Sequence, residues 1–135
     1  MTVRAGRRSR LAFGGLAASG ALSLALTGLA SAHHAWTEID TSRTLTLTGT
    51  VKLLHWENPH ASMLFEVVDG VGPDARRTDW TVEMSGISRM ESRGLTPAIL
   101  AQGAHLVIVA SPAWDVPHVV RANRIRRDDK DYGLY

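Results

Sequence analysis

Two adjacent histidines, His33 and His34, are the residues of this sequence best suited to chemistry, and they follow directly on Ala30-Ser31-Ala32. If the chain is cut after Ala32, His33 becomes the first residue, and its α-amine and imidazole Nδ1 can chelate one metal ion. A further nitrogen would complete a ligand set suited to copper. If the cut falls after Ala30, a histidine in third place forms the amino-terminal chelate for copper or nickel. Both starts favour Cu(II), whereas an exposed histidine pair in a flexible tail would bind metal only incidentally.

The beginning of the chain has the three parts of a secretory signal peptide. A basic start is followed by an apolar stretch over residues 11–30 and by the small-x-small exit Ala30-Ser31-Ala32. The stretch is about long enough to span a membrane, but it is rich in Gly, Ser and Thr, so we expect cleavage rather than a retained anchor. We predict a signal peptide over residues 1–32, a mature domain over residues 33–135 and a periplasmic or secreted location. Arg7-Arg8 also allows the twin-arginine export route, which leads to the same compartment as general secretion.

The charge of the mature chain argues against nucleic acid as a partner. The whole chain has 15 Lys and Arg against 13 Asp and Glu, a formal charge of +2. Four of the arginines lie in the leader, so 11 basic residues remain against 13 acidic ones and the mature charge is about −2. This balance gives no support for nucleic-acid binding. The sequence has no cysteine, which excludes a disulfide, a thiolate metal site and a lipid anchor at the cut.

A second pair of histidines flanks a turn. The segment "LLHWENPHA" places His55 and His60 on either side of the turn signal Asn58-Pro59. The two imidazoles could approach one another, and the N-terminal arm, at one end of the domain. In the alternative, Asn58-Pro59 only forms the turn and His60 caps it with a backbone hydrogen bond. The remaining histidines, His105 at a strand start and His118 in a loop, are single, and we expect structural roles for them.

Catalytic groups do not converge in the sequence. Glu66 and Glu83 fall at outward positions of predicted strands, so we expect solvent-facing charges rather than a hydrolytic pair. No Ser or Thr lies in a nucleophile motif. Four tryptophans could stack a ligand, but single tryptophans in strands more often pack on the core; they are Trp36, Trp56, Trp80 and Trp114. We therefore predict that the protein is not an enzyme.

Alternation of apolar and polar residues predicts a mainly β domain. The first strand runs over residues 43–55, with Gly49 as a bulge or a sharp coil in its middle. Four further strands are predicted over residues 61–69, 78–84, 105–110 and 119–126. Short helices are predicted over residues 87–93 and 98–102, a loop over 111–117 and a solvated charge run over 128–131.

The order of these elements predicts the architecture. Three strands, one or two short helices and two more strands, with a kinked first strand, are typical of a small five-stranded Greek-key barrel of the oligonucleotide/oligosaccharide-binding (OB) type. A small open sandwich is the alternative. In either case alternation places the following residues among the core candidates: Leu45, Leu47, Val51, Leu53, Trp80, Val82, Leu106, Ile108 and Ile125.

Together the motifs resemble a known family. "AHHAW" (32–36), "LTGTVKLLHWENPHA" (47–61), "DWTVEM" (79–84) and "SRGL" (92–95) are similar to domain of unknown function family 6152, a family of small exported bacterial proteins. Its members typically have A-H-H-S after a leader, then G-T-V, W-x-N-P-H, W-x-x-E and R-x-G. The resemblance covers nearly the whole mature chain, and Ala35, Leu95 and His55 depart from the family's usual residues. The positions that match its pattern are His33, His34, Trp56, Asn58, Pro59, His60, Trp80, Glu83 and Gly94.

The resemblance implies no activity, because the family has none that is settled. It does imply that the paired histidines and the N-P-H turn are shared features. We therefore predict an exported, non-enzymatic β-barrel that binds a divalent metal, copper foremost, through His33, His34 and His60. The alternative is an interaction module whose barrel face and tryptophans bind a protein, a peptide or a glycan.

Overall fold

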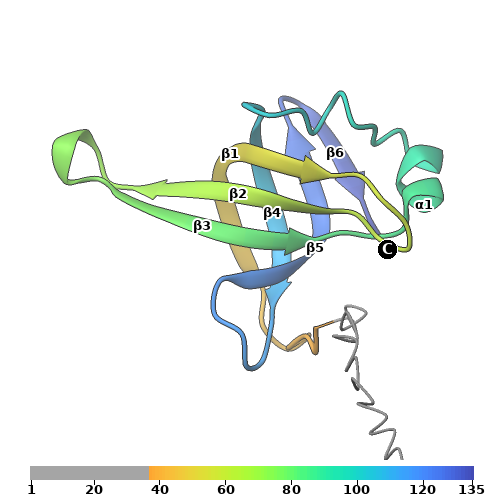
Figure 1. Cartoon of the computed structure of the whole chain (residues 1–135), viewed down its shortest axis with the longest axis horizontal. Helices are drawn as coiled ribbons and strands as arrows, with labels where there is room; N and C mark the ends of the chain where they lie inside the picture. The colour runs from red at the N-terminus through yellow and green to blue at the C-terminus, as the bar shows by residue number, and fades with distance from the viewer. Residues whose placement is uncertain (1–36) are drawn as a thin grey trace, which may run out of the picture. The chain divides into compact units, whose positions relative to one another are not determined.

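The computed structural model describes residues 37–135, so the predicted leader and the pair His33 and His34 lie outside the described residues. Six strands, one short α-helix and one 3₁₀ turn make up this part of the chain (Figure 1). The strands are β1 (Leu45–His55), β2 (Ser62–Asp69), β3 (Arg76–Glu83), β4 (His105–Pro112), β5 (Val119–Arg127) and β6 (Lys130–Gly133). The 3₁₀ turn η1 is Gly72–Asp74 and the helix α1 is Ile87–Ser92. Among residues 37–135, no helix is long and apolar enough to cross a membrane.

The first five strands close into a barrel. Hydrogen bonding gives the order β3-β2-β1-β4-β5-β6, and β3 also pairs with β5. The β3–β5 pairing is parallel and runs from Thr81 opposite Val119 to Glu83 opposite Arg121, while the other pairings are antiparallel. A five-stranded barrel with a helix between its third and fourth strands is the OB-type topology. The predicted fold class is confirmed, and the open sandwich is not formed.

Strand β1 belongs to both halves of the barrel. It pairs with β4 over residues 45–50 and with β2 over residues 49–55, so Gly49 lies opposite both Val67 and Leu106. A Cβ atom at Gly49 would lie 2.0 Å from the carbonyl oxygen of Glu66, closer than any side chain allows. Gly49 is therefore the point where the coiled strand passes from one sheet to the other, and glycine is needed because the neighbouring backbone is so close. The β-bulge lies further along, between Val51 and Leu53.

This bulge explains the one core prediction that is wrong. Leu53 is 48% exposed, because the irregular register after Val51 breaks the simple alternation and Leu54 packs against the core instead. Leu45 and Trp80 are partly buried against the core. The other six candidates are confirmed as buried: Leu47, Val51, Val82, Leu106, Ile108 and Ile125.

The bulged register predicts that the side chain of Leu53 faces solvent and that of Val51 faces the core, and this can be tested by substitution. Leu53→Thr is expected to change the free energy of unfolding by less than about 0.5 kcal/mol, because the side chain already faces solvent. Val51→Ala, two residues earlier, removes methyl groups from a side chain that is 1% exposed, and we expect it to cost about 2 kcal/mol. Urea denaturation of both variants measures the difference. Similar costs at the two positions would contradict the bulged register.

Three local predictions need correction. Residues 98–102 do not form a helix: Ile99 and Leu100 donate only to Thr96 and Pro97, which makes consecutive turns. Strand β4 continues to Pro112 into the predicted loop because the N-terminal arm and β5 pair with its end. The charge run 128–131 is a hairpin turn leading into β6, whose pairing with β5 lets the apolar Leu134 become fully buried.

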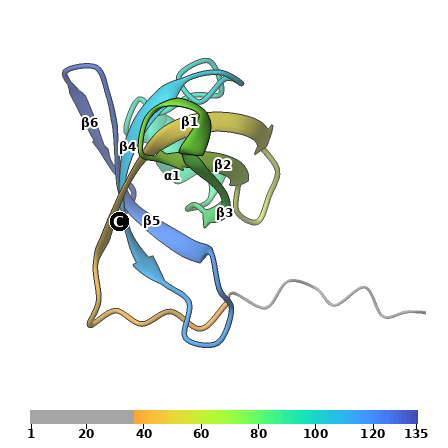
Figure 2. The same ribbon diagram turned by 90° about the vertical axis from the view of Figure 1, so that its left-hand side faces the viewer.

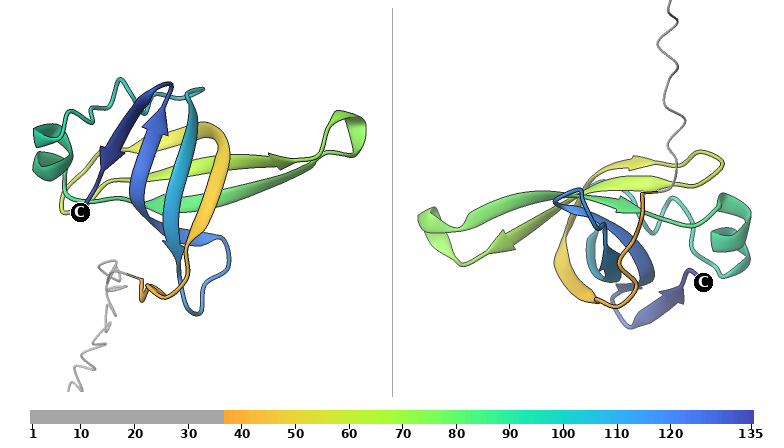
Figure 3. Two further views of the ribbon diagram at one scale, coloured as in Figure 1. Left: turned by 180° about the vertical axis from the view of Figure 1, so that it is seen from behind. Right: turned by 90° about the horizontal axis from the view of Figure 1, so that it is seen from below.

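The end of helix α1 and a projecting ribbon of β2 and β3 complete the description of the fold. Helix α1 ends before Gly94, whose φ of 81° gives the predicted left-handed cap. The ends of β2 and β3 extend beyond the barrel as a two-stranded ribbon with η1 at its tip, opposite the side that carries α1 (Figures 1 and 3). Strands β1, β4, β5 and β6 lie side by side in the left view of Figure 3.

Candidate functional site

The carboxylate of Glu83 is the clearest departure from the sequence prediction. It was expected to face solvent, but Glu83 is only 9% exposed at the end of β3. It points away from the barrel interior that Val82 fills, and other parts of the chain cover it. Single-strand alternation could not show this, because the covering residues come from β5 and from the segment before β1.

Two residues bind the Glu83 carboxylate, one oxygen each. The hydroxyl of Thr37 donates to Oε1 at 2.5 Å, and Nη2 of Arg121 donates to Oε2 at 3.1 Å. The same Nη2 also donates to the backbone oxygen of Thr37 at 2.9 Å. Thr37 is thus bound through both its side chain and its backbone. We call these three residues, Thr37, Glu83 and Arg121, the arm clamp.

Residues 37–40, the N-terminal arm, are bound along the end of β4. Trp114 donates its backbone N–H to the oxygen of Glu38, Ile39 forms a bridge with Ala113, and Asp40 donates to the oxygen of Pro112. Figure 2 shows the arm, in orange, running beside the loop between β4 and β5. The arm therefore approaches the clamp on a defined path along the barrel.

The C-terminus lies near the same clamp. Partial burial raises the pKa of the Tyr135 hydroxyl above its ordinary value; the charge of Arg121 opposes this rise and that of Glu83 adds to it. Arg93 Nη1 donates to the backbone oxygens of Gly133 and Tyr135 at 3.0 Å each, which ties the chain end to the residue after α1. The C-terminal residue is therefore close enough to the clamp to feel the charges of Arg121 and Glu83.

His60 lies in the segment that precedes β2. The first residue of β2, Ser62, lies opposite Glu83 in the pairing of β2 with β3. The backbone of Ala61 exchanges hydrogen bonds with Met84 and Ser85. His60 is half-buried, while His55, at the end of β1, is exposed and pairs with the same Ser62. The backbone segments that carry the two histidines therefore meet at the same end of the β1–β2 pairing.

The described residues do not complete a metal site by themselves. Within residues 37–135, no group of three or more His, Asp or Glu side chains could hold a metal ion. Of the predicted ligands, only His60 lies in this range. His105 is exposed, with Nδ1 3.0 Å from the hydroxyl of Thr50, and His118 contacts the ring of Trp80 edge-on at 4.9 Å. A metal site at His60 would need donors from residues before Thr37.

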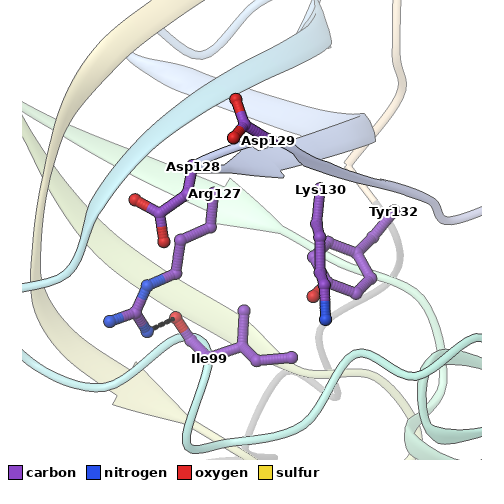
Figure 4. Close-up of a pocket in the computed structure, with 6 residues that line it drawn as sticks. All are labelled: Ile99, Arg127, Asp128, Asp129, Lys130 and Tyr132. Carbon is purple, nitrogen blue, oxygen red and sulfur yellow. Dashed lines mark hydrogen bonds between the residues drawn. The ribbon is translucent and has the colours of Figure 1, made fainter.

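A hollow of about 400 Å³ lies elsewhere, beside the hairpin of β5 and β6 (Figure 4). Its main cation, the guanidinium of Arg127, donates to the backbone oxygens of Ala98 and Ile99. Asp128, Lys130 and Tyr132 provide much of the remaining lining. These bonds of Arg127 hold the hairpin against residues 98–99.

The fold and this arrangement define a class: a small closed β-barrel with its N-terminal arm bound at one end. The chain belongs to the family of unknown function DUF6152, whose model matches residues 21–119. The match includes the histidine pair, the N-P-H turn and Glu83, and it ends at the first residue of β5. No curated protein matches the chain. The resemblance seen in the sequence is confirmed.

Proposed function

We propose that this protein is an exported, non-enzymatic β-barrel that binds copper through the His33 imidazole and α-amine, His34 and His60. The observation that supports this most is the arm clamp. It fixes Thr37, three residues after His34, at the end of the strand opposite the segment that carries His60. The proposed site thus combines the histidine pair with the N-P-H turn, and His34 and His60 are 26 residues apart in the sequence.

The lengths of chain involved permit a shared site. Thr37 lies three residues after His34, a reach of about 10 Å when extended. His60 lies two residues from Ser62, about 7 Å along the strand, and Ser62 pairs with Glu83 across a strand spacing of about 5 Å. These spans are comparable, which supports a shared site in which Thr37 stays bound.

The donor chemistry selects copper among common divalent ions. An amine and three imidazoles are nitrogen ligands, which suit copper, nickel and zinc, whereas magnesium and calcium require oxygen ligands. Cu(II) stands highest in the affinity order for such donors. Buffering or delivery of the ion in an oxidising compartment is the function that follows, because the sequence places no acid–base–nucleophile set beside the proposed ligands.

One surface supports the second candidate, an interaction module for a protein, peptide or glycan. Trp114 is 61% exposed and Val116 is 47% exposed, both in the loop between β4 and β5. Exposed tryptophan is common where proteins bind partners. In this alternative the N-P-H turn is structural and the histidines do not share an ion.

Copper titration distinguishes the candidates. The protein is expressed with its own leader, recovered from the periplasm and checked by intact mass, and Cu(II) is titrated against a competing chelator. We expect His60→Ala to lower the affinity at least about tenfold, or 1.4 kcal/mol, because one nitrogen ligand is lost. His105→Ala, which changes an exposed histidine bonded to Thr50, is the matched control and is expected to bind like the wild type.

Circular dichroism and the unfolding midpoint show whether each variant folds. Wild-type affinity no higher than that of a synthetic peptide of residues 33–42 would contradict the shared site. An equal loss in the His60 and His105 variants would also count against it.

A further inference from the structure

We propose that two copies of this chain associate through the open edge of β3, with residues 76–80 of one copy paired antiparallel to the same residues of the other. Strand β5 occupies this edge only from Thr81 to Glu83. Among the described residues 37–135, no strand pairs with residues 76–80 on the side away from β2. The stretch begins in the ribbon that projects from the barrel (Figure 1). An open strand edge is a template on which another strand can pair.

The backbone groups of Arg77 and Asp79 face this open edge. The N–H of Thr81 donates to the backbone oxygen of His118, on the side of β5. Because the backbone groups of successive residues in a strand alternate between its two edges, those of Arg77 and Asp79 point the same way as those of Thr81. Their N–H and C=O groups are therefore directed at a strand that pairs along residues 76–80.

The length of the open edge and twofold symmetry select one register. A pairing centred on Thr78 matches residues 76–80 of one copy with residues 80–76 of the other, so it uses the whole edge. A centre at Arg77 or Asp79 would shorten the paired stretch, because β3 begins at one side of it and β5 covers the edge at the other. Centred on Thr78, Arg77 faces Asp79 of the second copy as a hydrogen-bonded pair, which exchanges both backbone hydrogen bonds.

The charges on the outer face of β3 favour the same register. Within one copy, Nη1 of Arg77 binds Glu66 and the carboxylate of Asp79 binds Lys52. The side chain of Arg77 is still 65% exposed and that of Asp79 is 45% exposed. Opposite charges directly across a strand pair stabilise it, and like charges destabilise it. The centre at Thr78 places each Arg77 opposite Asp79, whereas the neighbouring centres would place two arginines or two aspartates opposite one another.

A disulfide trap tests the pairing directly. The chain has no cysteine. Residues opposite one another in a non-hydrogen-bonded pair have Cα atoms about 4.5 Å apart, a distance that a disulfide can span. With oxidised glutathione and a metal chelator present, we expect Thr78→Cys to form a covalent dimer at least about tenfold faster than Val71→Cys, because paired strands hold the two thiols together. Val71, which is 93% exposed at the tip of the ribbon, is the control position. Equal rates in the two variants overturn the proposal.

Charge reversal tests the register. In Arg77→Asp, two carboxylates face one another at each pair, and in Asp79→Arg, two guanidiniums do. We expect each variant alone to associate at least about tenfold more weakly than the wild type. An equal mixture of the two variants is expected to regain association, because a carboxylate then faces a guanidinium at both pairs. The altered contacts with Glu66 and Lys52 within each copy persist in the mixture, so they cannot cause the recovery.

Sedimentation equilibrium of the mature protein measures the association from about 10 µM to about 1 mM, because so short a pairing buries less area than a stable complex. Arg126→Asp and Asp131→Arg make the same charge changes in the β5–β6 pairing and are the matched controls. They are expected to associate like the wild type, alone and mixed, and circular dichroism shows whether each variant folds. A wild type that stays monomeric over this range overturns the proposal. Equal loss and recovery in the control variants, or no recovery in the test mixture, also overturns it.

Discussion

Replacement of Gly49 by alanine is expected to destabilise the barrel by about 3 kcal/mol or more, a severe case of steric overpacking. The added Cβ would lie 2.0 Å from the backbone oxygen of Glu66 and 3.0 Å from Cε1 of Phe65. The first contact is with backbone in a paired strand, so a rotamer change cannot relieve it. Relief requires β1 and β2 to separate where β1 also pairs with β4, which weakens both halves of the barrel.

Chemical denaturation with a thermal scan measures this effect. For a domain of this size, a loss of about 3 kcal/mol lowers the midpoint temperature by about 12 °C or more. Gly133→Ala is the matched control, because a Cβ there would lie 3.5 Å from Nη1 of Arg93, an ordinary contact with a flexible side chain. If Gly49→Ala were as stable as this control, the close approach of β1 and β2 would be wrong.

Acetylation of the α-amine is expected to reduce the Cu(II) affinity by at least about 100-fold, or 2.7 kcal/mol. In the proposed copper site the amine would be a ligand whether the leader is cut after Ala32 or after Ala30, so the prediction does not depend on the exact site. An acetylated amine has no basic lone pair, and the chelate ring with the imidazole is lost.

Selective modification is feasible near neutral pH because the α-amine has a pKa close to 8, far below that of lysine. The side chain of Lys52 is additionally protected, because its hydrogen bond to Asp79 raises its pKa above the ordinary lysine value. Isothermal titration of acetylated and untreated protein compares the affinities, and intact mass confirms a single acetyl group. Retention of full affinity after acetylation would exclude the amine as a ligand.

Much of the fold follows from local alternation. The strands that form the barrel coincide with runs of Leu, Val, Ile and Thr at period two, and six of the nine core candidates are buried. Alternation works here because each barrel strand has one face in the core and one face toward solvent. The glycine in the middle of β1 also identifies the crossing point of the two sheets, since glycine weakens a strand interior and is placed there where the backbone must bend or approach a neighbour closely.

The candidate site was harder to predict from the sequence. The motifs at His33, His34 and His60 are visible as residues, but Glu83 is indistinguishable from any outward carboxylate of a strand. Its burial depends on Thr37 and Arg121, which are 46 and 38 residues away in the chain. Glu83 is the last residue of β3, and Arg121 lies early in β5. The sequence does not indicate that these two residues form an ion pair, because the parallel pairing of β3 and β5 that brings them together is visible only in the structure.

The amino-acid pattern alone predicted the five barrel strands, the β-barrel class and the family, because these depend on periodicity and residue type. Folding in three dimensions established which charges are buried, where the bulge turns Leu53 outward, and where the arm is bound. Those features arise from contacts between segments distant in the chain, and the free energy of such contacts depends on geometry that no local stretch contains.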